Sequence, residues 1–289
     1  MSVKSILVLS LNADANESTL DCALKVARRF GAHISVTHIN GLPQITAAAG
    51  FDLNSGLPSE ALLNEFEASE TERETKAHAA FEDFVRREAL PIQTTPEHSD
   101  EVSASWNVLE SGVPHAVGLQ GSAYDLIVTA RPQHGAASQA RKMVESALFS
   151  TGRPVLIASP DPPKTLGDTV LVGWNRGAPA ARAFHAAKAL ILEGAKRVHL
   201  LSVTTGAKSG PSAQDIATNL IWNGISAEVS EIEPDHRSVG EVVLAEADAI
   251  AADLVVLGAF SHSRLLETIL GGVTQHVITN ANVPVFMAH

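Results

Sequence analysis

The sequence has very little cysteine and no long hydrophobic run. Cys22 is the single cysteine among 289 residues, which excludes an intramolecular disulfide framework and a cysteine-based structural zinc site. Its apolar helical neighbours predict a buried, inert thiol. No apolar run reaches the roughly 20 residues that a membrane-spanning helix needs. The segment from Met1 to Ser5 enters a predicted strand without a signal or transit pattern, so we expect a cytoplasmic protein with no membrane partner.

Positive charge is also scarce. The chain has 21 lysines and arginines against 32 acidic residues, and its net charge of −11 disfavours a general nucleic-acid-binding surface. The 12 histidines are scattered and lack metal-ligand spacing. His33 and His38, for example, fall on opposite faces of one predicted strand. We therefore predict neither a nucleic-acid partner nor a metal site.

Three common catalytic motifs are missing. The sequence has no G-x-x-x-x-G-K-[ST], no G-x-G-x-x-G after its first strand and no G-x-S-x-G. Their absence argues against a P-loop kinase or ATPase, a Rossmann dehydrogenase and a hydrolase with a nucleophile elbow.

What the chain does contain is an internal repeat. The segment Asp125–Val128 recurs as Asp253–Val256, and each copy is followed by an amphipathic stretch and a short strand that opens with Pro-Val. Asn12 and Asn175 each follow the first strand of a half. Such a repeat predicts two copies of one domain. Three prolines at residues 159–164 predict the linker, with domains at 1–160 and 165–289.

Short apolar runs alternate with helical patterns in both halves, which is typical of an α/β fold with parallel sheets. We predict two tandem doubly wound parallel-sheet domains of five strands each. The predicted strands cover residues 5–11, 33–39, 92–97, 125–130 and 154–158, then 169–174, 197–203, 226–232, 253–258 and 283–288. The predicted helices cover about 18–30, 59–88, 102–118 and 136–150, then 178–193, 211–223, 238–251 and 262–280.

The fourth strand of the second half leads into a loop of small and polar residues. Gly258 is followed by Ser261-His262-Ser263, and nine residues separate Ser261 from the Gly271–Thr274 segment. Free N–H groups at a helix start, together with glycines, favour anion binding. A tight strand–helix turn without a ligand is the alternative interpretation.

The chain resembles a tandem member of the universal stress protein family over both halves, apart from the 40–60 loop and the linker. The family's nucleotide-binding motif is glycine, two residues, glycine, nine residues, then glycine and a hydroxyl residue. Gly258 and Gly271 match, whereas Ser261 replaces the second glycine and Gly272 replaces the hydroxyl residue. Asn175 stands where the family has an aspartate.

The resemblance implies an adenine-nucleotide alpha-hydrolase-like fold and a partly retained nucleotide pocket in the second half. The implied binding residues are Asn175, Val203, Gly258, Ser261, His262, Ser263, Gly271, Gly272, Val273 and Thr274. Ser261 loses glycine's backbone freedom, Gly272 loses a hydroxyl group that Thr274 would replace, and Asn175 lacks a charge.

The first half departs further from the motif. Ala130 stands at the place of Gly258, and Arg141-Lys142 at the place of the glycine pair. We expect this half to have lost the nucleotide pocket. Its basic residues, Arg131 included, either hold another anion or form a solvated face.

The expected function is that of a non-enzymatic stress-response protein with weak binding of ATP or a related adenine nucleotide. A slow ATP hydrolase or phosphotransferase and a ligand-free structural regulator are the alternatives. The apolar edge strands Val155–Ala158 and Val283–Ala288 are expected to pair between domains or subunits, which gives an intramolecular pseudo-dimer or a homodimer. Trp106, Trp174 and Trp222 are expected to be packing residues, with Trp174 also a candidate for the pocket border.

Overall fold

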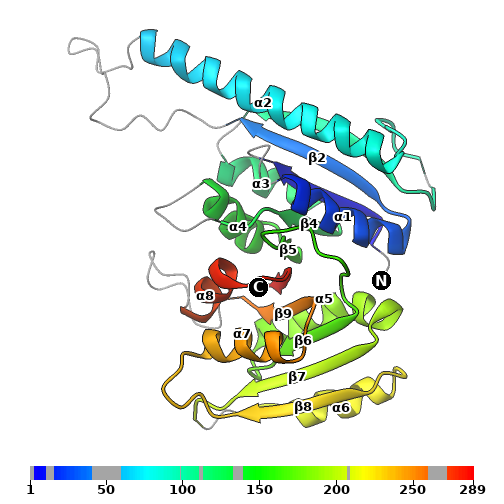
Figure 1. Ribbon diagram of the computed structural model, residues 1–289, viewed down its shortest axis with the longest axis vertical. Coiled ribbons are helices and arrows are strands. Elements are labelled where there is room, and N and C mark those ends of the chain that lie inside the picture. The colour runs from blue at the N-terminus through cyan, green and yellow to red at the C-terminus, as the bar shows by residue number, and fades with distance from the viewer. Residues whose placement is uncertain are drawn as a thin grey trace.

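The computed structural model describes residues 3–10, 16–40, 60–97, 99–110, 113–132, 139–206, 209–259 and 272–289. These residues form a single sheet of ten strands with helices on both faces (Figure 1). The architecture confirms the predicted α/β fold class with a mostly parallel sheet.

Each half of the chain contributes five parallel strands, and both halves use the same strand order. The first half gives the order β3-β2-β1-β4-β5 and the second gives β8-β7-β6-β9-β10. The strands are β1 (Ser5–Ser10), β2 (His33–Asn40), β3 (Ser103–Glu110), β4 (Leu126–Thr129), β5 (Val155–Ile157), β6 (Thr169–Gly173), β7 (Arg197–Val203), β8 (Ala227–Ile232), β9 (Leu254–Gly258) and β10 (Val285–Ala288).

The two halves join through strands β5 and β10. They pair antiparallel, with Leu156 opposite Phe286 at the centre of the ladder. The expected pairing of these apolar strands therefore takes place within the chain. A strand edge that is paired in this way is no longer open to a neighbouring molecule.

Four helices cover each face of the sheet. Helices α1, α2, α5 and α6 pack on one face, and α3, α4, α7 and α8 on the other. The helices are α1 (Asn16–Phe30), α2 (Glu60–Glu88), α3 (Val113–Gly121), α4 (Gln139–Ser150), α5 (Ala178–Gly194), α6 (Ala213–Ile221), α7 (Val239–Ala249) and α8 (Gly272–Asn280).

One strand lies where a helix was predicted. Residues 103–110 form β3, whereas 92–97, predicted as that strand, contribute only an isolated bridge between Ile92 and Ala104. The predicted helix over 102–118 is correspondingly reduced to α3. Because β3 is an edge strand with polar residues on one face, its period-two pattern lacks the continuous apolar run of a central strand.

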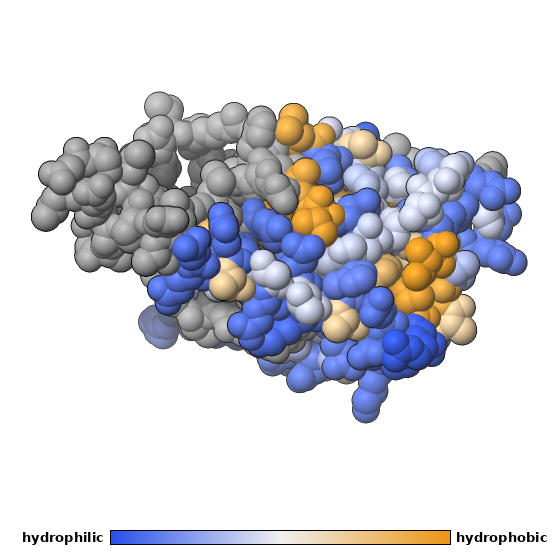
Figure 2. Space-filling model, turned by 90° about the horizontal axis from the view of Figure 1, so that it is seen from above, coloured by the Kyte–Doolittle hydropathy of each residue, from blue (hydrophilic) through white to orange (hydrophobic). Residues whose placement is uncertain are grey.

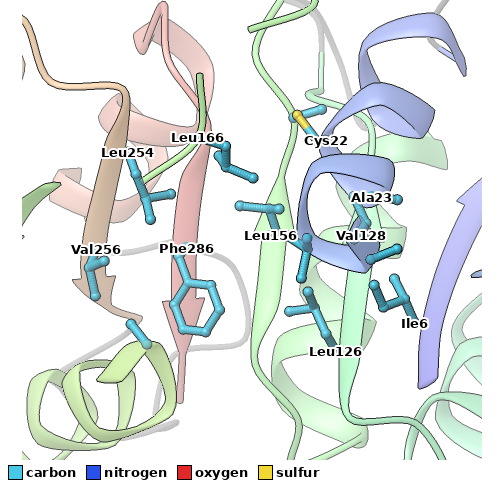
Figure 3. Packing of buried hydrophobic residues seen from close by; sticks show 14 of the residues in the cluster. Ile6, Cys22, Ala23, Leu126, Val128, Leu156, Leu166, Leu254, Val256 and Phe286 are labelled. Atoms are coloured by element: carbon cyan, nitrogen blue, oxygen red, sulfur yellow. The ribbon is translucent and has the colours of Figure 1, made fainter. Parts of the chain in front are cut away.

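The hydrophobic core runs continuously through the junction of the halves. Leu156 and Phe286 lie on neighbouring strands in one layer with Val128 and Leu254 (Figure 3). Cys22 is fully buried in the same cluster, and this burial raises the pKa of its thiol to about 11. The prediction of an unreactive cysteine is thereby supported.

The long helix α2 is a covering helix, as its spacing predicts. Its apolar residues Phe81 and Phe84 are buried, while most of its described acidic residues are exposed; Glu70 departs from this pattern because it is buried and paired with Arg73. Seen from the α2 side, the described surface is mainly hydrophilic with separate hydrophobic spots (Figure 2).

Trp222 corrects another expectation. Its side chain is 87% exposed at the end of α6, so it is not a packing residue. Trp106, in contrast, stacks on His38 with ring centroids 5.9 Å apart.

Among the helices that the structure describes, none combines the length and apolar character required to cross a membrane.

Candidate functional site

The predicted site lies where neighbouring strands of the second half end. Asn175 follows β6, Gly258 ends β9 and Val203 ends β7, and these three strands are adjacent in the sheet. Strand order changes direction between β6 and β9, since β7 and β8 lie on one side and β10 on the other. Such a switch point is where open α/β sheets bind ligands.

Asn175 forms a tight turn into helix α5. Its Oδ1 accepts a hydrogen bond of 3.0 Å from the backbone N–H of Gly177. Arg176, between them, has φ of +65°, a left-handed conformation that costs a non-glycine residue about 1–3 kcal/mol. Strain of this kind concentrates at ligand sites, and sequence analysis did not single out Arg176. Its charge acts on Asp215, whose pKa is lowered mainly by hydrogen bonds from Ser212 and further by Arg176.

Trp174 is a packing residue, as predicted. Its indole is 4% exposed and lies edge-on to Phe184, with centroids 6.3 Å apart. Its Nε1 donates a hydrogen bond of 2.8 Å to the carbonyl oxygen of Pro211. The indole thus anchors the segment before α6 to the end of β6.

Gly258 has a structural reason to be glycine. A Cβ at this position would lie 2.3 Å from the backbone nitrogen of Ala180 and 2.5 Å from the carbonyl carbon of Pro179. The missing side chain lets the first turn of α5 approach the end of β9. Helix α5 therefore begins at the switch point, directly beside the strand that carries the glycine motif.

Helix α8 begins at the same motif. A Cβ at Gly272 would meet no heavy atom within 4 Å, so a small side chain would fit at this position. Val273 is 37% exposed, whereas Thr274 is 5% exposed and faces the interior with Val277. Four predicted residues, Ser261, His262, Ser263 and Gly271, lie outside the described residues.

Asp253, at the other end of β9, has a structural role. Its Oδ1 accepts hydrogen bonds from the N–H groups of Gly167 and Thr169, and its Oδ2 accepts one from Asp168. These bonds fix the backbone at the start of β6, which is the structural role expected of a residue at the edge of a strand. In the described ranges, no three or more histidine, cysteine or acidic side chains gather in a way that would hold a metal ion.

Two basic residues of the first half, Arg131 and Arg141, make contacts within the protein. Arg131 donates through Nη1 to the carbonyl oxygen of Ile278 at 2.6 Å and through Nη2 to that of Val283 at 2.9 Å. Burial lowers its pKa to about 10. Arg141 forms an ion pair with Glu145. Arg131 is therefore neither a solvated residue nor an anion ligand, but a link to the second half.

The sequence did not predict a cavity that lies in the first half. A volume of about 750 Å³ lies at the amino ends of β1, β2 and β3. The available signal was the alternation Ser103-Ala104-Ser105-Trp106-Asn107, which places polar residues on one face of a strand. That face forms part of the cavity wall.

Comparison with known proteins agrees with the resemblance noted in the sequence. Residues 223–289 match the model of the universal stress protein family, and this range contains the glycine motif and β10. No curated protein matches the chain.

Two solved structures share the fold over nearly the whole chain. A universal stress protein of Archaeoglobus fulgidus DSM 4304 is similar with a TM-score of 0.62 and 18% identity, covering 100% of this chain and 99% of that one. A functionally unknown protein of Pseudomonas aeruginosa PAO1 has a TM-score of 0.54 and 17% identity, covering 99% and 92%. The predicted resemblance to universal stress proteins is confirmed.

Proposed function

We propose that this chain is a non-enzymatic stress-response protein whose second half binds ATP or a related adenine nucleotide weakly. The observation that carries the proposal is that Asn175 follows β6 and Gly258 ends the adjacent strand β9, at the switch point, while helix α8 begins at Gly272 of the glycine motif. The family match covers the glycine motif and α8.

Each element at the proposed site suits one part of a nucleotide. The N–H groups at the start of α8 and the dipole of that helix favour a phosphate chain. The open space at Gly272 leaves the backbone accessible. Asn175, at the end of β6, would accept hydrogen bonds from the adenine or ribose, and Val203 would supply apolar contact beside it.

Three departures from the family's motif, at Asn175, Ser261 and Gly272, support weak affinity. The amide of Asn175 is neutral, and its Oδ1 already accepts the N–H of Gly177. Gly272 offers no hydroxyl, and Thr274 turns its side chain inward. Each lost hydrogen bond weakens binding by about 0.5–1.5 kcal/mol, so the three together reduce affinity by several-fold to about a hundred-fold.

Calorimetric titration with ATP and AMP tests the proposal. Asn175→Asp retains the turn acceptor and adds a charge, so it should tighten binding severalfold. Gly272→Leu should abolish binding by covering the start of α8, and its Cβ would meet no heavy atom within 4 Å. As a control, Asn223→Asp adds the same negative charge at the end of α6, away from the proposed site, and should leave affinity unchanged. Unaltered affinity in both site variants would refute this location.

A slow ATP hydrolase or phosphotransferase is the second candidate, because the same pocket would serve it. Asp253, a carboxylate of the motif region, is committed to backbone groups at the start of β6. Nucleotide turnover by the purified chain, measured against Gly272→Leu, separates the two functions. Turnover above that control would favour the enzyme.

A ligand-free structural regulator is the third candidate. Mass spectrometry of the gently purified protein, combined with thermal shift at millimolar ATP, distinguishes it from the nucleotide-binding protein. Detection of neither bound adenine nucleotide nor a thermal shift would favour this alternative.

Assembly and location complete the proposal. We propose cytoplasmic residence, to be tested by cell fractionation. Since β5 and β10 already pair within the chain, a homodimer would have to use another surface. Light scattering of the purified chain measures whether it forms.

A further inference from the structure

The cavity at the amino ends of β1, β2 and β3 is lined by a polar wall that belongs to no predicted site. The strands begin in register here, with Ser5 opposite His33 and His33 opposite Ser103. Every second residue of β2 and β3 then points to the same side. The side chains that form the wall are His33, Ser35, Ser103, Ser105, Asn107 and Tyr124.

These side chains are organised into two hydrogen-bonded groups. His33 bonds through Nδ1 to Ser103 Oγ at 2.8 Å and through Nε2 to Ser105 Oγ at 2.9 Å. Ser35 Oγ bonds to Asn107 Nδ2 at 3.1 Å and to the Tyr124 hydroxyl at 3.0 Å. Ser35, Ser103 and Ser105 are all less than 9% exposed, so their geometry is fixed by the sheet.

A count of hydrogens shows that the wall retains unused donors. Burial lowers the pKa of His33, which favours the neutral ring with one N–H. One serine therefore accepts from the ring and the other donates to it, so one serine hydrogen is left over in either tautomer. The same holds for the bond between Ser35 and Tyr124, where the hydroxyl that accepts keeps its hydrogen. In the described ranges, the contacts of these residues provide no acceptor for the two remaining hydrogens.

Acceptors border the same space. Asn107 lines the cavity and donates through Nδ2, which leaves its amide oxygen as an acceptor, and hydroxyl oxygens accept as well as donate. A wall that both donates and accepts complements a ligand whose own groups do both. Hydroxyl groups have this property.

The charged residues at the rim oppose an anionic ligand. Glu97 and Glu101 contribute two carboxylates to the lining. Lys4, the cation of the lining, already bonds through Nζ to Asp100 Oδ1 at 2.6 Å and to the carbonyl oxygen of Phe30 at 2.7 Å. The described lining residues thus offer no unpaired positive charge for a phosphate, while the two carboxylates would repel one.

The second half places larger groups, an imidazole and a carboxylate, at the corresponding position. Strand register makes His199 the counterpart of Ser35 and Ser230 the counterpart of Asn107. His199 Nε2 lies 2.9 Å from Ser230 Oγ and 3.2 Å from Glu246 Oε1 of helix α7. In the second half, His199 and helix α7 therefore cover the corresponding wall. In the first half, the smaller serine side chains leave a hollow.

We propose that this cavity binds a neutral polyhydroxylated small molecule of the size of a mono- or disaccharide, recognised by the hydroxyl, amide and imidazole groups of β2, β3 and Tyr124. Its volume of about 750 Å³ lies within the usual range for small-molecule sites. The site is separate from the proposed nucleotide site, so either one can fail without the other.

Tyr124 gives this proposal a direct reporter, because it is the single tyrosine of the chain. Labelling with ¹³C-tyrosine yields one ring spin system, located in the cavity wall. We would titrate the full chain with glucose, sucrose and maltose, and with glucose 6-phosphate as the charged counterpart. A saturable shift with at least one neutral sugar is expected, with weaker binding of glucose 6-phosphate than of glucose.

Two variants and one control fix the location. Asn107→Ala alters an exposed side chain, so the fold is retained, and should weaken sugar binding about two- to tenfold through the loss of one hydrogen bond. Ser35→Leu should abolish binding by filling the hollow, with thermal unfolding as the test of its fold. Ser230→Ala, at the counterpart position, should leave binding unchanged.

Three results would overturn the proposal. They are the absence of any shift with the three neutral sugars at tens of millimolar, binding of glucose 6-phosphate at least as tight as that of glucose, and sugar affinity that Asn107→Ala leaves unaltered.

Discussion

Arg131 and Ile278 lie 147 residues apart in the sequence, yet Arg131 Nη1 donates to the carbonyl oxygen of Ile278 at 2.6 Å. The same guanidinium reaches the carbonyl oxygens of Val277 and Val283. These oxygens belong to the last turns of α8 and to the segment before β10. A cation at the C-terminal end of a helix interacts favourably with the helix dipole. A residue of the first half therefore holds the helix that begins at the candidate nucleotide site.

Replacing this arginine should loosen the contact between the halves. Arg131→Met removes charge-assisted hydrogen bonds to buried carbonyl groups and should lower the free energy of unfolding by about 1.5–3 kcal/mol. Urea denaturation measures the change. Arg86→Met, which removes the exposed (i, i+3) pair with Asp83, should cost less than about 0.5 kcal/mol. Equal effects of the two substitutions would contradict the special role of Arg131.

The repeated aspartates should be structural in both halves. Asp125 Oδ2 accepts from the N–H groups of Lys4 and Ser5, just as Asp253 accepts at the start of β6. Asp253→Ala leaves half-buried N–H groups without acceptors and should destabilise the protein by about 1–3 kcal/mol, measured by thermal unfolding. Asp83→Ala, at an exposed helix position, should stay within about 0.5 kcal/mol of the parent.

Two glycines of the motif should respond in opposite ways to alanine. In Gly258→Ala, the new Cβ would lie 2.3 Å from Ala180 N, and overpacking of this kind costs about 1–3 kcal/mol. At Gly272, the Cβ meets open space at a helix start, so the substitution should be neutral or slightly stabilising. Melting temperatures of the two variants make the comparison. A stable Gly258→Ala protein would show that α5 does not need this close approach.

The buried histidine of β2 should make stability depend on pH. His38 is 1% exposed, and burial lowers its pKa from the ordinary 6.5, opposed by Glu74 and reinforced by Arg73. The unfolded chain then binds more protons below about pH 6.5 than the folded chain does. The contribution of His38 is therefore complete above that pH and is lost as the pH falls toward the lower folded value.

His38→Phe, which keeps the stacking on Trp106, should flatten this loss between pH 7 and 5 in urea denaturation series. His33, whose pKa is also lowered, should maintain part of the slope. His236→Gln, at an exposed position, serves as the control and should leave the curve unchanged.

The sequence by itself determined most of the elements, because both the apolar runs of buried strands and the helical spacing are local patterns. The runs of β1, β4, β6 and β9 are buried on both faces and read directly. The edge strand β3 was not predicted, because Ser103, Ser105 and Asn107 line a polar cavity and interrupt the apolar run. The position of Asn175 and Gly258 at strand ends was also readable.

The tertiary structure decided what no local pattern encodes. Pairing of β5 with β10 in one continuous sheet depends on contacts between distant segments, as does the commitment of Arg131 to carbonyl groups of α8. The close approach of α5 gives Gly258 a packing role that its motif did not reveal. The cavity beside Tyr124 arises because serines in two strands, brought into register by the sheet, leave space that His199 and Glu246 occupy in the other half.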